Sequence, residues 1–441
     1  MNGKRMHRHL AMRPFAASSR SPSKAIQADQ GVRTSIERNA MHRIWTKRFH
    51  QWMTRMAMVS TAVVMVALIA PGAQALSLAD QLGRIPGLFG RQNSSKLAKP
   101  YAVLPESFYP TSVVWSPDGK YIADTGILTP SIHIWNVKTK QIVKELSLDA
   151  QSDGYHAMAW SPDGRYLAVC ANTGPFMAGI WDTDTWKLVA QLVDPRRGFL
   201  GLRGDYGCQS PAFAPDHRYL AIATGNDVYV YSTMSWSEVT HSLFNELPVG
   251  YAFNINEIAF QPHSSEIAIG VNGYFRSDPV SGRARVIFWN IKSPAPDLTN
   301  GLLIHSFIAY RIGAMQSLAY NPSGTQLATG TNSGGGSTYT QNLVTASARI
   351  WDPTSYKLLA APLDGHDRAG GINGLAFSAD GRYLIAAHTG PKGEIDFIDA
   401  QSYKVADTLY VDHLIGAIAV NPRAPMFVAT DNNKLMIWSI Q

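Results

Sequence analysis

The feature that most constrains this chain is a short segment that recurs seven times. Residues 113–124 read VVWSPDGKYIAD, and residues 158–169 read MAWSPDGRYLAV. The position of Trp115 is occupied in the later copies by Trp160, Phe213, Phe260, Tyr320, Phe377 and Val420. Successive copies lie 45, 53, 47, 60, 57 and 43 residues apart. Internal repeats of this length are typical of architectures in which each copy forms one supersecondary unit.

Each copy contains several short runs rich in Val, Ile and aromatic residues, separated by turn-forming residues. A second run follows the SPDG corner, and a third, aromatic-rich run reads IHIWNV at 132–137 and ARIWDP at 348–353. The first six copies add a fourth run, such as KLVAQLV at 187–193. Such runs are typical of β-strands. Four strands in about 40–60 residues form the blade of a β-propeller, so the sequence predicts an all-β, seven-bladed propeller with four-stranded antiparallel blades over residues 99–441.

The seventh copy stops after its third run, at Gln441. A closed ring needs a fourth strand there, and the run PYAVLP at 100–105 precedes the first copy. We therefore expect this N-terminal run to complete the seventh blade. A small residue precedes most of the aromatic positions, for example Ala159 before Trp160. Because neighbouring strand residues point to opposite faces, each blade should present a small residue on one face and a large one on the other.

The SPDG corner could in principle supply catalytic acids, Asp118 and Asp163. Its composition favours a structural role, because Pro suits the first central position of a turn, Asp accepts backbone N–H groups and Gly adopts positive φ. Several copies lose the Asp-Gly pair while the two-strand pattern persists. We therefore interpret both aspartates as turn-forming residues.

Five third runs close on a tryptophan followed by a small polar or acidic residue, at Trp135-Asn136, Trp181-Asp182, Trp289-Asn290, Trp351-Asp352 and Trp438-Ser439. Gly365-His366 precedes the sixth copy. These dipeptides resemble those that close and open the repeats of WD40-type propellers. With its SPDG corners, the chain is most similar to bacterial exported WD40-like or TolB-like propellers. This family hosts many roles, so the resemblance implies the fold and only a broad binding function.

The basic excess of the chain lies in its leader. Residues 1–75 hold 12 Lys/Arg and 2 Asp/Glu, a net charge of +10, whereas residues 76–441 hold 27 and 30, a net charge of −3. Binding to nucleic acid needs positive charge on the folded surface, so the sequence argues against a nucleic-acid partner.

The leader has the order of a signal peptide. Arg43, Lys47, Arg48 and Arg55 precede an apolar run at 56–70, and Ala73-Gln74-Ala75 matches an A-x-A cleavage site. We expect a leader at 1–75, a linker at 76–98, and a periplasmic or secreted protein. Three alternatives stay open: residues 56–70 are an uncleaved inner-membrane anchor, residues 1–55 are a transit peptide, or the true start is Met41 or later.

The links between the second and third strands and between successive blades should share one face of the ring, because the strands alternate in direction. These links are the long ones, and loops on a rigid scaffold commonly carry binding. Arg and aromatic side chains are typical anchors of interfaces. The candidates are Arg196, Arg197, Phe199, Arg203, Tyr206, Tyr274, Phe275, Arg276, Tyr339 and Arg368. The alternative is that these are variable, solvated loops.

Cys170 and Cys208 are the only cysteines. In an exported protein they predict a disulfide between the second and third blades, the alternative being two buried free thiols. Four histidines, His156, His366, His388 and His413, could lie on the same loop-rich face. Without a short-range ligand pair among them, the sequence predicts no metal and no cofactor.

Two functions remain from the sequence. The first is an exported, non-catalytic propeller that binds a protein or ligand through its loop-rich face, as a scaffold or as an accessory subunit of an envelope complex. The second is an exported propeller enzyme, similar to a dehydrogenase or lactonase, with a cofactor or metal at the axial funnel held by those histidines. A membrane is a partner only if the signal segment is uncleaved.

Overall fold

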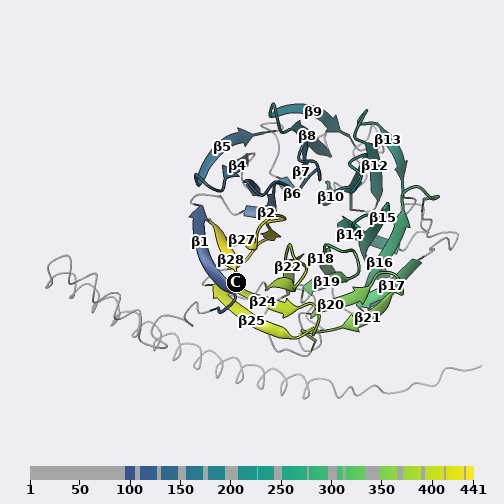
Figure 1. Cartoon of the computed structure of the whole chain (residues 1–441). Helices are drawn as coiled ribbons and strands as arrows, with labels where there is room; N and C mark the ends of the chain where they lie inside the picture. The colour runs from purple at the N-terminus through teal and green to yellow at the C-terminus, as the bar shows by residue number, and fades with distance from the viewer. Residues whose placement is uncertain are drawn as a thin grey trace, which may run out of the picture. The chain divides into compact units, whose positions relative to one another are not determined.

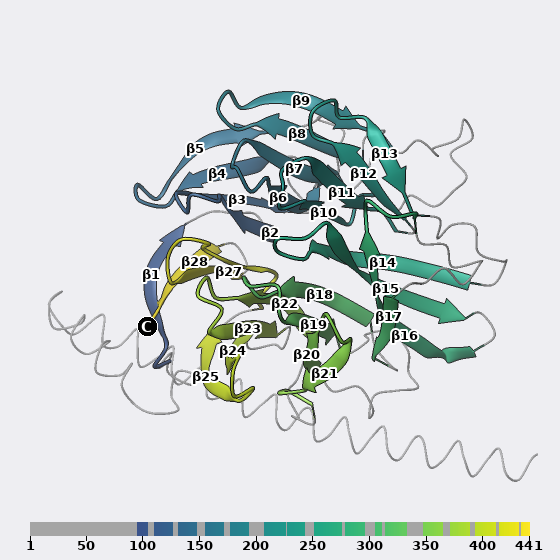
Figure 2. The ribbon, with the colours of Figure 1, turned by 45° about the vertical axis from the view of Figure 1, so that its right-hand side comes forward.

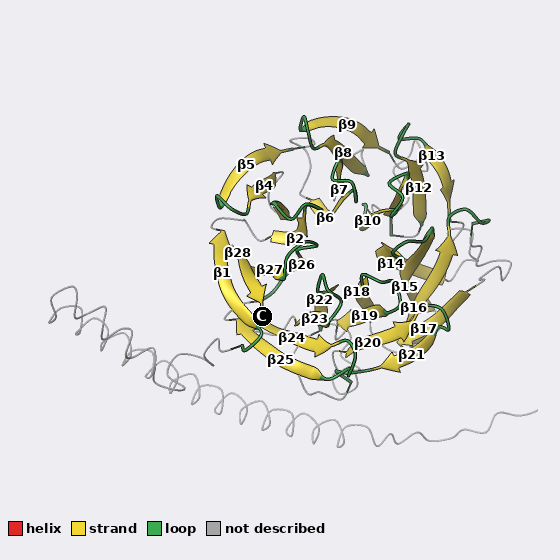
Figure 3. Ribbon diagram, in the orientation of Figure 1, coloured by secondary structure: helices red, strands yellow, loops and turns green. Residues whose placement is uncertain are grey.

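The structure is a computed structural model. It describes residues 95–104, 110–126, 131–147, 155–171, 177–193, 207–225, 227–242, 251–275, 278–295, 305–310, 314–332, 347–364, 371–388, 393–411, 414–431 and 434–441. The chain divides into two units, Met1–Phe89 and Gly90–Gln441, and every described residue lies in the second. Within the described ranges the secondary structure consists of strands and turns, with no helix (Figure 3).

Seven four-stranded antiparallel sheets are arranged as blades around a ring (Figure 1). From the innermost strand outward, blade 1 consists of β2 (Pro110–Trp115), β3 (Tyr121–Gly126), β4 (Ile132–Asn136) and β5 (Gln141–Leu146). Blade 2 consists of β6 (Tyr155–Trp160), β7 (Tyr166–Ala171), β8 (Ala178–Asp182) and β9 (Lys187–Leu192). Blade 3 consists of β10 (Ser210–Phe213), β11 (Tyr219–Ala223), β12 (Val228–Ser232) and β13 (Glu238–His241). Blade 4 consists of β14 (Tyr251–Phe260), β15 (Glu266–Phe275), β16 (Asp278–Asn290) and β17 (His305–Tyr310). Blade 5 consists of β18 (Ala314–Tyr320), β19 (Leu327–Asn332), β20 (Ser347–Asp352) and β21 (Lys357–Ala360). Blade 6 consists of β22 (Ile372–Phe377), β23 (Tyr383–His388), β24 (Gly393–Asp399) and β25 (Val405–Val411). Blade 7 consists of β26 (Ile418–Val420), β27 (Met426–Asp431), β28 (Lys434–Ile440) and β1 (Ala98–Leu104).

The N-terminal strand closes the ring, as the sequence predicts. β1 pairs antiparallel with β28, from Ala98 opposite Ile440 to Leu104 opposite Leu435. The strand begins two residues before the predicted run. The residues just before β1 are hydrogen-bonded to Asp407 of blade 6. Its Oδ2 accepts from Oγ of Ser95 at 2.6 Å and from the backbone N–H of residues 96 and 97 at 2.6 and 2.8 Å. Both ends of the propeller are therefore held in one closing seam.

The core is divided into seven layers, each formed between two neighbouring blades among the described residues. Phe213 of β10 packs into the layer shared with blade 2, whereas Ala212 beside it packs into the layer shared with blade 4. Phe260 and Ala259 of β14 divide in the same way between blades 3 and 5. The predicted alternation of large and small residues is confirmed, and it lets adjacent blades interdigitate.

The SPDG corners are hydrogen-bonded turns, so Asp118 is a structural residue. Its Oδ1 accepts from Oγ of Ser116 at 2.6 Å and from the backbone N–H of Lys120 at 3.0 Å, while Gly119 adopts a φ of 72°. Burial alone would raise the pKa of Asp118, but the hydrogen bonds from Ser116 and Lys120 hold it below its usual value. An aspartate that stays ionised is a good turn acceptor and a poor acid near neutral pH.

The acidic residue of the tryptophan dipeptides also caps a turn, the one between the third and fourth strands. Oδ1 of Asp182 accepts from the backbone N–H of Thr185 at 2.9 Å. The last residue of this turn is a large aromatic with a left-handed φ in four blades, at Trp186, Trp236, Tyr356 and Tyr403. This conformation is strained for a bulky residue and needs compensating contacts. Trp236 of blade 3 gains them across the blade boundary, against Tyr166 of blade 2 with ring centroids 5.0 Å apart.

Candidate functional site at the loop-rich face

The two faces of the ring differ in the length of their links. The links between first and second strands are short corners such as residues 116–120, and those between third and fourth strands are mostly short turns such as residues 183–186. The opposite face, which carries the links between second and third strands and between blades, has the longer ones, and we call it the loop-rich face. The first-strand face is called the plain face below.

Blade 4 extends farther on the loop-rich face than its neighbours. Its strands β14, β15 and β16 are 10, 10 and 13 residues long, whereas the strands of the other blades have seven residues or fewer (Figure 2). The backbone pairing continues to Phe275, opposite Tyr251 and Asp278. Tyr274 and Phe275, which we expected on a loop, therefore lie on a strand, and this prediction was wrong. The extension places them on a rigid β-sheet, although their side chains lie outside the described part.

The other predicted binding residues, Arg196, Arg197, Phe199, Arg203, Tyr206, Arg276, Tyr339 and Arg368, lie outside the described residues. The leader and its signal peptide, residues 1–75, also lie outside them, as do His366 and His413. His156 lies in β6, with its side chain outside the described part. No helix in the described ranges is long and apolar enough to cross a membrane.

His388 is placed by the structure inside blade 6. Its side chain is 1 % exposed, and Nε2 lies 2.9 Å from Oδ2 of Asp396 on the neighbouring strand β24. Oδ1 of the same carboxylate accepts from Oγ1 of Thr408 on β25, at 2.6 Å. This pairing joins three strands of one blade. A histidine so placed contributes to the packing of its blade and is not presented on the loop-rich face as a metal ligand.

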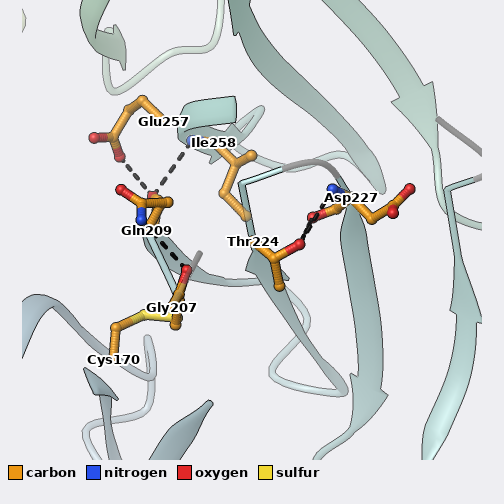
Figure 4. Close-up of a disulfide and its surroundings, with 9 residues drawn as sticks. Cys170, Gly207, Gln209, Thr224, Asp227, Glu257 and Ile258 are labelled. Atoms are coloured by element: carbon orange, nitrogen blue, oxygen red, sulfur yellow. Dashed lines mark hydrogen bonds between the residues drawn. A yellow bond between two sulfur atoms is a disulfide. The ribbon is translucent and has the colours of Figure 1, made fainter. Parts of the chain in front are cut away.

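Cys170 and Cys208 form a disulfide, with Cα atoms 5.0 Å apart and both side chains fully buried. Cys170 lies near the end of β7 in blade 2, and Cys208 lies two residues before β10 in blade 3. Figure 4 shows the disulfide directly beside the first residues of that inner strand. The covalent link therefore joins blades 2 and 3 at the loop-rich face, two residues before β10 begins.

Six of the seven copies carry a polar residue at the same position, at the loop-rich end of the inner strand or just before it. Four residues before each aromatic position lie Thr111, His156, Gln209, Asn256, Gln316, Asn373 and Gly416. We call Gln209, Asn256, Gln316 and Asn373 the amide row. Nδ2 of Asn256 donates to the carbonyl oxygen of Met315 in the next blade at 3.0 Å, and Nδ2 of Asn373 donates to that of Ile415 at 3.3 Å. These amides join neighbouring blades and keep partial exposure to solvent.

A second row lies one residue farther along the inner strands and is almost entirely small. It consists of Ser112, Ala157, Ser210, Glu257, Ser317, Gly374 and Ala417. Oγ of Ser317 accepts from the backbone N–H of Leu375 in the next blade at 2.9 Å, and Oγ of Ser210 accepts from that of Ile258 at 3.3 Å. These serines satisfy the N–H groups that an inner edge strand leaves unpaired.

Glu257 is the exception in this row. Oγ of Ser210 donates to its Oε1 at 2.8 Å (Figure 4), and among the described residues no cationic side chain forms an ion pair with it. Burial raises the pKa of Glu257 to about 7, an effect that the hydrogen bonds from Ser210 and from the backbone of Ile258 only partly oppose. The sequence did hold a signal for this residue: aligning the seven copies sets one glutamate against six small residues.

The amide row and one carboxyl group place polar residues on the inner ring of the propeller. Within the described ranges no three His, Cys, Asp or Glu side chains lie close enough together to hold a metal ion.

A family model described as "WD domain, G-beta repeat" matches residues 357–390. This segment covers β21, β22 and β23, together with the Gly365-His366 pair. The chain contains a WD40 repeat. The search of curated proteins gives no match. Among solved structures, the chain is similar to the β-propeller domain of Cps50 (Swd1) from Myceliophteria thermophila, with a TM-score of 0.57 and 17 % sequence identity over 78 % of this chain and 100 % of that one.

At this identity, the structural likeness shows the fold alone. A single fold of this kind hosts many unrelated functions. The function must therefore be inferred from the surfaces of this chain.

Proposed function

We propose that the chain is an exported, non-catalytic β-propeller that binds a protein or a small ligand through its loop-rich face, in a scaffold or accessory role. The observation that carries the proposal is the asymmetry between the two faces. Capped turns of near-constant length form most of the plain face, whereas the loop-rich face combines long links with the extended strands of blade 4. Binding surfaces are commonly built in this way, from variable segments on a rigid frame.

Two features of the loop-rich face support binding beyond its length. The disulfide between Cys170 and Cys208 and the hydrogen bonds of the amide row hold the inner ends of the blades in place. A preorganised surface loses less conformational entropy when a partner binds, so more of the contact energy remains as affinity. The Arg and aromatic residues of the long links provide side chains of the kind enriched in interface hot spots.

Export is proposed from the leader and is supported by the cysteines. Disulfides persist in oxidising compartments and are rare in the cytosol. On this proposal the protein is periplasmic or secreted, or remains attached to the inner membrane if residues 56–70 are not cleaved. Fractionation of native cells followed by mass spectrometry of the N-terminus tests it: a mature chain that begins near Leu76 is expected, and recovery from the cytosol with residues 1–75 intact would contradict it.

Affinity capture tests the binding proposal. The full chain, tagged after Gln441, is expressed in its native cells, cross-linked and recovered from the envelope fraction. A triple variant reverses charge on the loop-rich face at Arg196, Arg197 and Arg203. A matched triple variant reverses it on the plain face at Lys138, Lys187 and Lys404, which are all exposed.

We expect one or more proteins to be recovered with the wild-type chain and with the plain-face variant, and recovery to fall at least tenfold with the loop-rich-face variant. Loss of the partner from the plain-face variant alone would place binding on the other side of the ring and contradict the proposal. Circular dichroism of both variants checks that the propeller is folded.

A further inference from the structure

The seven inner strands contain one charged residue. β2, β6, β10, β14, β18, β22 and β26 hold no Asp, Lys or Arg, and their only Glu is Glu257. The other six blades place Ser, Ala or Gly at this position. Glu257 is therefore the single acidic residue on the seven inner strands, which lie nearest the axis of the ring.

Among the described residues, the surroundings of Glu257 hold it between blades and provide no cationic side chain. Its backbone pairs with Gly270 of β15, and a Cβ added at Gly270 would lie 3.0 Å from Sδ of Met315 and 3.3 Å from the carbonyl oxygen of Glu257. Blades 4 and 5 are therefore in close contact here. The facing strands β10 and β18 contain no titratable residue except Tyr320, and the acidic residue of β15, Glu266, pairs with Asn290 at the opposite end of the strand.

The polar residues that the structure describes next to Glu257 are neutral. Ser210 donates one hydrogen bond to the carboxyl group, and the neighbouring Gln209 and Asn256 belong to the amide row. Burial of the carboxyl group raises its pKa to about 7. Glu257 keeps partial exposure, so a group that arrives from the solvent can reach it.

A cationic group would supply what this site lacks. An ammonium or guanidinium group donates several hydrogen bonds and can pair with the carboxylate oxygens. An anionic group would be repelled, and a neutral group would leave the charge uncompensated. Since β14 begins on the loop-rich face, the cation would come from a partner bound there.

We propose that Glu257, held by Ser210, binds one lysine or arginine side chain of a protein partner. The inference rests on the proposed function, because the partner docks on the loop-rich face, and it names the chemistry that this face recognises. Binding displaces the proton that the carboxyl group carries in part at neutral pH. Affinity therefore rises with pH from 6 to 8, as the carboxylate becomes the prevailing form.

The test uses the full-length protein and four acetylated pentapeptides in which lysine, arginine, glutamine or glutamate stands between glycines. Binding is measured by isothermal titration calorimetry at pH 8 and pH 6. We expect the lysine or the arginine peptide to bind at least tenfold more tightly than the glutamine peptide at pH 8. A pKa of about 7 predicts that this affinity falls roughly tenfold at pH 6.

Glu257→Gln should abolish the preference for the cationic peptide. Glu257→Ser provides a second variant that introduces the residue found at the same place in blades 1, 3 and 5, so it should fold. Glu145→Gln, on the exposed outer strand β5, is the control and should leave binding unchanged. Equal binding of the lysine, arginine and glutamine peptides overturns the proposal, as does a preference that survives both Glu257 variants. Tight binding of Ca²⁺ or Zn²⁺ that requires Glu257, without binding of either cationic peptide, also overturns it.

The two proposals can fail separately. If the partner captured by the wild-type chain is recovered equally well with Glu257→Gln, the loop-rich face binds a partner but Glu257 does not recognise its cation. If the cationic peptides bind through Glu257 while no partner is captured, the peptide site stands and the proposed partner-binding function fails.

Discussion

Removing one buried side chain of the closing strand should weaken the whole propeller. Leu104 lies at the end of β1, opposite Leu435 of β28, and is fully buried in the layer between blades 7 and 1. Leu104→Ala removes three carbon atoms from this layer and leaves a cavity. Substitutions of this kind cost about 3 kcal/mol when the surroundings cannot collapse. For a propeller of this length, an unfolding entropy of about 2 cal/mol/K per residue converts the loss into a decrease in Tm of roughly 4 °C.

Val103→Ala is the matched control, because Val103 is the neighbouring residue on the same strand and is 47 % exposed. It should reduce the free energy of unfolding by less than about 1 kcal/mol. Differential scanning calorimetry and urea unfolding of the two variants provide the comparison. If Leu104→Ala and Val103→Ala lower stability equally, or if neither lowers it, then β1 does not close the ring as described.

Three further predictions concern the disulfide and two carboxyl groups. Replacing Cys170 and Cys208 by serine, or reducing them, should cost about 4 kcal/mol of stability, because the bridge closes a segment with a sequence separation of 38 residues; unfolding in urea with and without reductant measures this. Burial alone would raise the pKa of Asp407, but the hydrogen bonds from Ser95 and the backbone hold it below its usual value, so its stabilisation is complete above about pH 4 and is lost as the pH falls further. Asp407→Asn should therefore be less stable than wild type at pH 7, and the difference should shrink in acid, as thermal unfolding at several pH values will show. Glu257 should change stability in the opposite direction with pH, because its pKa is raised on folding and the folded state keeps a proton that the unfolded state loses. The free energy of unfolding should therefore fall as the pH rises from about 5 to 7. Glu257→Gln should reduce this dependence, as urea unfolding at several pH values will show.

The fold was predictable because each copy repeats one packing rule. The small–aromatic pair, as in Ala212-Phe213, assigns one residue to each neighbouring blade, and the truncated seventh copy requires a strand from elsewhere. Such patterns report on local strand geometry and burial, which composition and spacing reflect directly. The disulfide could be proposed because both cysteines were expected at the loop-rich ends of adjacent blades.

Other features depend on contacts between blades that no local pattern encodes. Trp236 looks like an ordinary turn residue, yet its left-handed backbone is held by Tyr166 of the preceding blade. Strand connectivity places Tyr274 and Phe275 in the link between the second and third strands of their copy, whereas β15 continues through both residues and pairs there with β14 and β16. Glu257 is not among the residues that the sequence analysis selects, because it stands out only when the same position is compared across all seven blades.

Site-directed photocross-linking tests the central claim, that the loop-rich face binds a partner, most directly. A photoreactive phenylalanine derivative is placed at Tyr274, on the extended strand β15, and separately at Met234, which is 91 % exposed in a turn of the plain face. The full chain is irradiated in its native cells, and adducts are identified by mass spectrometry. A specific adduct from position 274 and none from position 234 is the predicted result. An adduct from position 234 alone would contradict the account.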